Sequence, residues 1–170
     1  MPRIKNYVAI PQGVSCALID SSVSFAGPKG DFEVVFPPEV SVENRDGGLW
    51  IDCSNPAMVG TFCSHMKNAV IGVTSGFLGV MKLVGTGFRV EYKNDLILKV
   101  GFSHLVNMAV PSDVTVSCPD PNTINVSGVD KHAVFQFCAN LRRIRPPNVY
   151  DGKGIHLVGS FVVRKERKKK

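Results

Sequence analysis

The chain has 170 residues, and its 20 lysine and arginine residues outnumber 14 aspartate and glutamate residues, which leaves a formal net charge of +6. Hydrophobic residues make up 44% of the chain, so a buried core is expected rather than a disordered chain or a coiled-coil rod. No apolar run reaches the roughly 18 residues of a membrane span, and the first residues lack the apolar stretch of a secretory signal. The composition predicts a globular protein of one domain or two small ones, with no membrane partner.

The spacing of the cysteines argues against metal sites and disulfides. The closest two, Cys53 and Cys63, are ten residues apart, so the C-x-x-C pairs of zinc and redox motifs are missing. An odd number of cysteines in a chain with enough apolar residues for a core does not suggest a disulfide framework. We therefore expect all five to be small buried side chains in a reducing compartment, with no metal and no cofactor. They are Cys16, Cys53, Cys63, Cys118 and Cys138.

The first predicted elements are a β-hairpin and a helix. Short segments at 41–43 and 49–53 flank the turn-forming run 46–48 (D-G-G), which predicts two antiparallel strands. Asn55 is a typical N-cap residue, and Pro56 suits the first helical turn, so a helix is expected over 55–70. Its apolar residues recur at helical spacing and predict one buried face: Val59, Phe62, Met66, Ala69 and Val73.

The same order of elements follows further along the chain. Segments 114–118 and 123–127, separated by the turn-forming run 119–122 (P-D-P-N), predict a second hairpin. A second helix is expected over 130–145, with Asp130 as its N-cap. Its apolar stripe consists of Val134, Phe137, Cys138, Leu141 and Ile144.

The two sets of elements are weakly repeated in sequence. At an offset of 75 residues, Asn55 corresponds to Asp130 and the pair Phe62-Cys63 to Phe137-Cys138, and the hairpins correspond at an offset of 74. The repeat predicts an α+β fold of two tandem similar domains, each an antiparallel sheet with one helix packed on one face. We place these domains at residues 1–81 and 82–170.

Positive charge is concentrated in the last 40 residues. Residues 131–170 contain eleven basic and two acidic side chains, a net charge of +9, whereas the rest of the chain sums to −3. Such crowding favours a polyphosphate partner, because each neutralised phosphate releases counterions. For the terminal lysines, a solvated tail is an equally good explanation. The candidate contact residues are Lys131, Arg142, Arg143, Arg145, Lys153, Arg164, Lys165, Arg167 and Lys168.

No catalytic pattern is present in the sequence. The chain lacks the glycine-rich motifs of dinucleotide and nucleoside triphosphate sites, and it lacks the H-E-x-x-H motif of zinc hydrolases. The neighbours Ser103 and His104 would point to opposite faces of a strand, where a nucleophile and its base could not meet. We therefore expect neither an enzyme nor a small-molecule substrate.

The segment after the second helix combines cations, prolines and glycines. Arg142, Arg143 and Arg145 would end the helix at its negative dipole end, before a proline pair at 146–147 that stops it. Gly152 and Gly154 remove side-chain bulk around Lys153, so the backbone could approach a phosphate closely. Tyr150 could stack on an unpaired base or sugar. The alternative is a flexible tight turn with a lysine in solvent.

This segment resembles a known signature. Residues 146–155 (P-P-N-V-Y-D-G-K-G-I) are similar to the P-x-x-Y-K-G-K-G-I loop of the bacterial-type ribosomal protein six family of the large subunit. Residues 27–30 (G-P-K-G), 83–89 (L-V-G-T-G-F-R) and 100–104 (V-G-F-S-H) resemble further family motifs in the family's order. The resemblance covers the whole chain.

The resemblance implies two similar α+β domains that bind large-subunit rRNA mainly through the C-terminal domain, near the sarcin–ricin loop and the translation-factor site. Neighbouring ribosomal proteins would be partners, and translation factors would lie nearby. By position, the RNA-contacting loop falls on Tyr150, Gly152, Lys153 and Gly154. The chain departs from the family at Asp151, where lysine is usual, at 148–149 (N-V for E-P), and at Leu105, which replaces proline.

Alternatives to a ribosomal component are a free-standing RNA- or protein-binding module, which would not sediment with large subunits, and an enzyme, which would show turnover. For the compartment, the low lysine content and the departures at Leu105 and Asp151 suggest a mitochondrial ribosome. A bacterial cytoplasm or a plastid is the alternative, because the first residues lack an Arg- and Ser-rich presequence.

Overall fold

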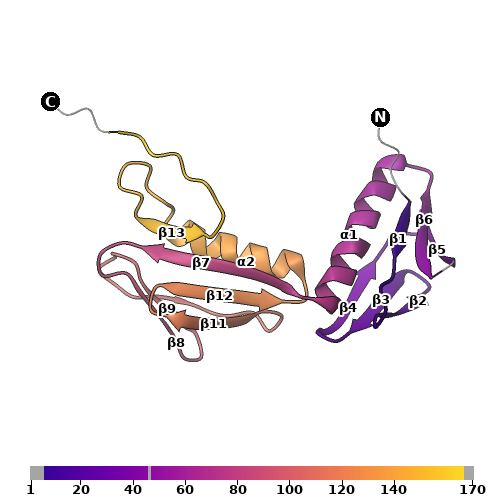
Figure 1. Cartoon of the computed structure of the whole chain (residues 1–170), viewed down its shortest axis with the longest axis horizontal. Coiled ribbons are helices and arrows are strands. Elements are labelled where there is room, and N and C mark those ends of the chain that lie inside the picture. The colour runs from indigo at the N-terminus through magenta and orange to yellow at the C-terminus, as the bar shows by residue number, and fades with distance from the viewer. Residues whose placement is uncertain (1–5, 46, 167–170) are drawn as a thin grey trace. The chain divides into compact units, whose positions relative to one another are not determined.

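The computed structural model describes residues 6–45 and 47–166 (Figure 1). The chain forms two compact units: Met1–Phe77 with Val129–Lys131, and Leu78–Gly128 with His132–Lys170. We call them the N-terminal unit and the C-terminal unit. Each combines antiparallel strands with one long helix, which confirms the α+β fold of two similar domains. The domain limits at 81 and 82 stay a prediction about independent folding.

Two three-stranded sheets make up the N-terminal unit. One has the order β1-β6-β5 and the other β2-β3-β4, and every pair is antiparallel. The predicted hairpin is β5 and β6, with Val40 opposite Cys53 and Arg45 opposite Gly48. The strands are β1 (Tyr7–Ala9), β2 (Ser15–Ile19), β3 (Ser22–Gly27), β4 (Gly30–Val35), β5 (Val40–Arg45) and β6 (Gly48–Cys53).

Helix α1 (Pro56–Thr74) lies along these strands (Figure 1). Its start is as predicted, because the Asn55 side chain accepts a hydrogen bond from the Ala57 N–H at 3.0 Å. The helix continues to Thr74, four residues beyond the predicted segment. Its buried face packs with strand residues into one apolar core that includes Val23, Phe25, Leu49, Ile51, Val59, Cys63, Met66, Ala69 and Val73.

The C-terminal unit has a four-stranded sheet of order β11-β12-β7-β13 and a three-stranded sheet of order β10-β9-β8. The predicted second hairpin is β11 and β12. The last strand, β13, returns beside β7 with Gly154 opposite Val84. The strands are β7 (Phe77–Val84), β8 (Arg89–Tyr92), β9 (Leu96–Lys99), β10 (Val106–Met108), β11 (Thr115–Asp120), β12 (Thr123–Gly128) and β13 (Gly154–Leu157).

Helix α2 (Lys131–Ile144) covers one face of the four-stranded sheet (Figure 1). Val134, Phe137, Cys138 and Leu141 are buried, as the apolar stripe predicted. The sheet approaches the helix closely at Gly79, where an added Cβ would lie 2.6 Å from the Cys138 Sγ. Neither α1 nor α2, the helices of the described residues, is long and apolar enough to cross a membrane.

Two local predictions were wrong. Ser103 and His104 do not lie on a strand but in a bend between β9 and β10, because Gly101 takes a left-handed backbone conformation (φ +81°). All five cysteines are free thiols, but only Cys63 and Cys138 are buried. The other three lie on strands β2, β6 and β11 and are only partly buried: Cys16, Cys53 and Cys118.

Candidate nucleic-acid interface

The C-terminal end of α2 carries exposed cations. Arg142 and Arg143 occupy the last helical turn, and Arg145 follows it directly. The free carbonyl groups at a helix C-terminus carry partial negative charge, which stabilises cations there. The proline at position 146 restricts the residue before it to extended backbone, so the helix ends at Ile144. Three arginine residues therefore lie within four consecutive positions at the end of α2.

The following loop, residues 146–154, is held by its own hydrogen bonds. The Asn148 N–H donates to the Lys153 carbonyl and the Gly152 N–H to the Asn148 carbonyl, both at 2.8 Å. The Asn148 side chain accepts from the Tyr150 N–H at 2.9 Å. The Ile155 N–H donates to the Arg145 carbonyl at 2.9 Å, which joins the two ends of the loop. These bonds favour a defined loop over the flexible turn that was the alternative.

Gly152 and Gly154 allow close packing within the loop. Both are buried, at φ +67° and +143°. An added Cβ would lie 2.7 Å from the Arg164 guanidinium at Gly152, and 2.6 Å from the Pro146 carbonyl oxygen at Gly154. Both glycines therefore shape the loop, and the approach of a phosphate to their backbone stays a prediction. They leave the Lys153 side chain exposed, and Tyr150 is 50% exposed beside it.

The C-terminal segment returns to this loop. The Lys165 N–H donates to the Val149 carbonyl at 2.9 Å, and the Arg164 guanidinium lies over Gly152. The structure therefore brings this segment back to the loop, although nine residues of chain lie between the end of the loop and Arg164. The predicted contacts Arg167 and Lys168 lie outside the described residues.

Lys131 is not part of this cluster. It begins α2, whereas Arg142 and Arg143 end it, and it packs with the N-terminal unit. Its ammonium donates to the Asn68 side chain at 3.3 Å and lies 5.9 Å from the centre of the Phe77 ring. We define the basic surface as the exposed cations and the tyrosine of the helix end, the loop and the returning segment: Arg142, Arg143, Arg145, Tyr150, Lys153, Arg164 and Lys165.

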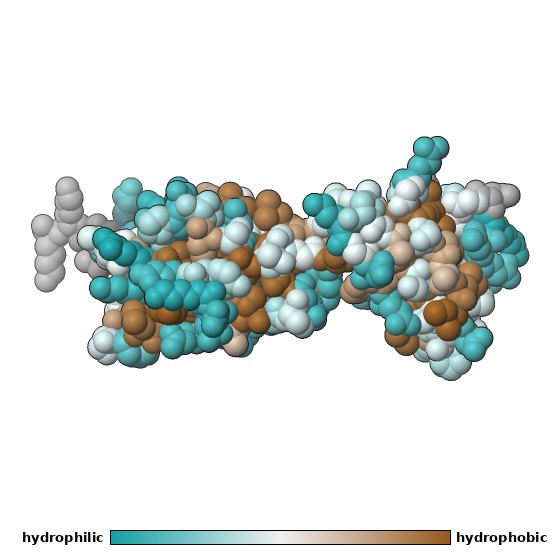
Figure 2. Space-filling view, turned by 90° about the horizontal axis from the view of Figure 1, so that it is seen from below, coloured by the Kyte–Doolittle hydropathy of each residue, from teal (hydrophilic) through white to brown (hydrophobic). Residues whose placement is uncertain are grey.

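An aromatic residue that the sequence reasoning missed joins the basic surface. The Arg145 guanidinium lies over the Phe102 ring, 5.2 Å from its centre. Phe102 was visible in sequence only within the short V-G-F-S-H motif, which carries no information about a partner some 40 residues later. In the view of Figure 2, hydrophilic residues cover parts of both units, with apolar residues between them.

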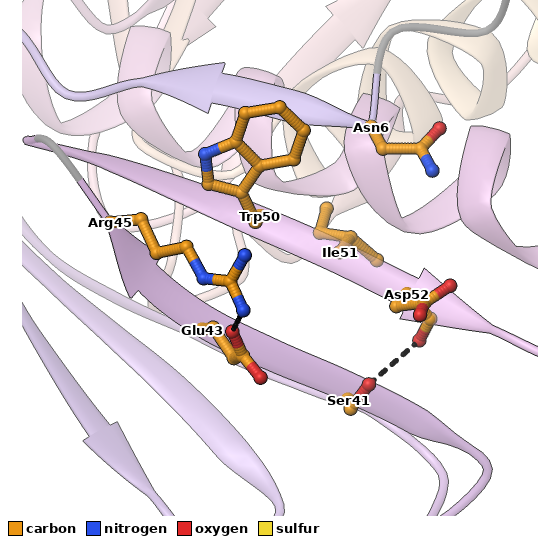
Figure 3. A pocket seen from close by; sticks show the side chains of 7 residues that line it. All are labelled: Asn6, Ser41, Glu43, Arg45, Trp50, Ile51 and Asp52. Atoms are coloured by element: carbon orange, nitrogen blue, oxygen red, sulfur yellow. Dashed lines mark hydrogen bonds and ion pairs between the residues drawn. The ribbon is translucent and has the colours of Figure 1, made fainter.

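The N-terminal unit offers a hollow of a different character (Figure 3). It has a volume of about 230 Å³ and lies on the β1-β6-β5 sheet beside Trp50. Arg45 is paired with Glu43, and Ser41 donates to the Asp52 carbonyl at 3.3 Å. The carboxylates of Glu43 and Asp52 disfavour a phosphate here. Within residues 6–45 and 47–166, no three His, Cys, Asp or Glu side chains gather to hold a metal ion.

Comparison with known proteins identifies the family. A family model described as Ribosomal protein L6 matches residues 84–157, which include α2, the loop and β13. A large ribosomal subunit protein uL6 from Thermotoga neapolitana is 43% identical over 179 residues, which cover 97% of each chain. The chain belongs to the uL6 family. Proteins of the same name from Acidithiobacillus ferrooxidans and Zymomonas mobilis are 39% and 37% identical, over 100% of both chains in each comparison.

Membership of the uL6 family confirms the resemblance seen in the sequence. It supports a structural role in the large ribosomal subunit and association with the ribosome. The relatives cited above come from bacteria, which fits the alternative of a bacterial cytoplasm. A mitochondrial location is not confirmed by them.

Proposed function

We propose that the chain binds large-subunit rRNA through the basic surface and acts there as an architectural protein, not as an enzyme. The observation that carries the proposal is the closed loop of 146–154, which carries the exposed Lys153, is bonded to the end of α2 through Arg145 and lies against Arg164 at Gly152. Side chains that converge from a helix end, a loop and a returning segment can contact several phosphates at once.

The site on the ribosome follows from the family resemblance. We propose that the basic surface lies near the sarcin–ricin loop and the translation-factor site, with neighbouring ribosomal proteins around the chain. Asp151 is exposed within the loop, where the family usually has lysine. Because a carboxylate repels phosphate, we assign the loop's phosphate contact to Lys153 and not to position 151.

Bacterial relatives at 37–43% identity support a bacterial ribosome. The mitochondrial ribosome suggested by the departures at Leu105 and Asp151 stays a prediction. Fractionation of the cells that carry the gene would decide between them.

A charge-reversal experiment tests the proposed surface. We expect Lys153→Glu combined with Arg142→Glu to reduce incorporation into large subunits by roughly 100-fold, because two phosphate contacts become repulsions. The matched control is Lys29→Glu with Arg45→Glu, an equal change of charge at exposed residues of the N-terminal unit. The readout is the fraction of protein that sediments with large subunits. Equal losses in the two variants would contradict the placement of the surface.

The same experiment addresses the alternative functions. A free-standing RNA-binding module would bind purified rRNA but would not sediment with large subunits. Turnover of any substrate by the purified chain would contradict the architectural role.

A further inference from the structure

An exposed stack of planar side chains borders the basic surface. The Arg145 guanidinium lies over the Phe102 ring, and the His104 ring stacks on the same ring with centres 5.7 Å apart and planes 16° apart. Phe102 is 37% exposed, and both Arg145 and His104 are exposed. The chain thus keeps a partly exposed aromatic ring in contact with two planar polar side chains, one of them a cation.

The backbone on both sides fixes this arrangement. On one side, Gly101 has a φ of +81°, and an added Cβ would lie 3.1 Å from the buried Phe88 ring. This turn follows the fully buried Val100, and Phe102 lies beyond it at the surface. On the other side, the Arg145 carbonyl accepts the Ile155 N–H, which holds the residue at the helix end. The stack therefore rests on two anchored segments and not on a mobile tail.

The contacts within this stack contribute little to the stability of the fold. An exposed cation–aromatic contact stabilises a fold by only about 0.5–1 kcal/mol. Phe102 together with the guanidinium and the imidazole that contact it instead forms an exposed planar surface next to the cations of the basic surface. Unpaired nucleotide bases bind to such faces, because a base stacks on aromatic rings and on guanidinium planes while its own phosphate is neutralised nearby.

We propose that Phe102, His104 and Arg145 form a stacking site for one unpaired nucleobase of the rRNA. This inference rests on the proposed function and deepens it. The cations of the basic surface would bind the backbone without regard to sequence, and the stack would select a place where a base is free to leave its helix. A fully double-stranded RNA segment would offer no unpaired base to this stacking site.

The first test measures binding of in vitro transcribed large-subunit rRNA. We expect Phe102→Leu, which keeps apolar bulk but removes the ring, to bind about 5- to 100-fold more weakly. The slope of log affinity against log salt should not change, because no cation is removed. The matched control is Phe135→Leu on α2, since Phe135 is also 37% exposed. Thermal melts of both variants show whether either effect reflects folding.

The second test uses tryptophan as a conservative replacement. The chain has a single tryptophan, Trp50, so Trp50→Phe with Phe102→Trp leaves one indole at the stack. We expect this double variant to bind rRNA as tightly as the unaltered chain does, unlike Phe102→Leu, because an indole stacks on a base at least as well as a phenyl ring does. Its fluorescence should be quenched on binding. Trp50→Phe with Phe135→Trp gives the background signal and should not be quenched.

The outcomes separate this inference from the proposed function. If the unaltered chain does not bind rRNA, the proposed function fails. A second outcome is that the unaltered chain binds rRNA and that the charge reversal at Arg142 and Lys153 weakens binding, whereas Phe102→Leu does not. The stacking site would then be wrong, and the proposed basic surface would remain supported. If Phe102→Leu binds rRNA normally but fails to enter large subunits, the stack contacts a neighbouring protein, which also overturns the inference.

Discussion

The two units share one plan and differ in charge. Each packs a long helix on antiparallel strands, and corresponding pairs, Phe62-Cys63 and Phe137-Cys138, lie on α1 and α2. The N-terminal unit has six basic and eight acidic residues, whereas the C-terminal unit has fourteen basic and six acidic ones. The comparison teaches that folding and the proposed RNA binding draw on different residues: apolar positions maintain both units, and exposed charged side chains distinguish them.

The surroundings of one exposed aromatic residue in each unit show the same difference in charge. On the N-terminal sheet, Trp50 lies among the carboxylates of Glu43 and Asp52, with Arg45 already paired (Figure 3). On the C-terminal unit, the aromatic Phe102 lies under a guanidinium beside further cations. An aromatic side chain alone thus does not mark a nucleic-acid site, because the charge around it decides which partner it admits.

The largest effect is expected from cutting the chain between the units. Fragment 78–170 should fold, whereas 82–170, which begins at the limit predicted from sequence, should be unfolded or destabilised by at least about 2–5 kcal/mol. The shorter fragment lacks the fully buried Met81 and the Val80 carbonyl that accepts the Val158 N–H at 2.8 Å. Urea unfolding followed by circular dichroism measures both. Equal stability would support the limit at 81.

A smaller effect is expected from a single glycine of the loop. Gly154→Ala should lower the free energy of unfolding by about 2–4 kcal/mol, since it adds a backbone clash to a strained φ. Gly13→Ala is the control, because Gly13 has φ +93° but nothing within 4 Å of an added Cβ, so only strain of about 1–2 kcal/mol applies. Equal losses in thermal unfolding would show that packing at Gly154 is unimportant.

Removal of single charges tests whether the cations of the C-terminal unit, and not those of the N-terminal unit, contact phosphates. We expect Arg142→Ala and Lys153→Ala each to reduce the slope of log affinity for rRNA against log salt by about 1, with up to about tenfold weaker binding. Lys29→Ala on the N-terminal unit should leave the slope unchanged. Filter binding between low and physiological salt provides the measurement, and an equal change at Lys29 would contradict the contrast between units.

The smallest effect concerns the two corresponding helix cysteines. Burial raises the pKa of the Cys138 thiol above its ordinary 9.0, and it raises that of Cys63 although Lys67 acts in the opposite direction. The folded chain therefore keeps protons that the unfolded chain loses, so the free energy of unfolding should fall as pH rises through about 9. Cys63→Ala and Cys138→Ala should each flatten this fall by less than about 1 kcal/mol between pH 8 and 10. An increase of stability over that range would contradict it.

Helices and strands that are marked by caps, apolar spacing or turn residues were predictable from the sequence. Asn55 and Pro56 marked the start of α1, the stripe from Val134 to Leu141 marked the buried face of α2, and turn residues marked both helix-preceding hairpins. The meander β2-β3-β4 and the sheet β10-β9-β8 were not predicted from the sequence, although their strands are consecutive in the chain and the turns at 20–21 and 28–29 are only two residues long.

The candidate site was predictable in composition but not in geometry. The charge count located its cations, yet the return of Arg164 and Lys165 to the loop depends on a backbone bond to Val149. The burial of Gly152 and Gly154 depends on packing against Arg164 and Pro146, which spacing does not encode. The same holds for Phe102, whose contact with Arg145 joins segments far apart in sequence.

The bond between the Ile155 N–H and the Arg145 carbonyl has a consequence for how this protein can change over time. Because it fixes the spacing of α2 and β13 at the base of the loop, replacements at exposed positions such as Asp151 need not disturb either element. Binding preference can then drift from one lineage to another while the scaffold beneath it stays the same.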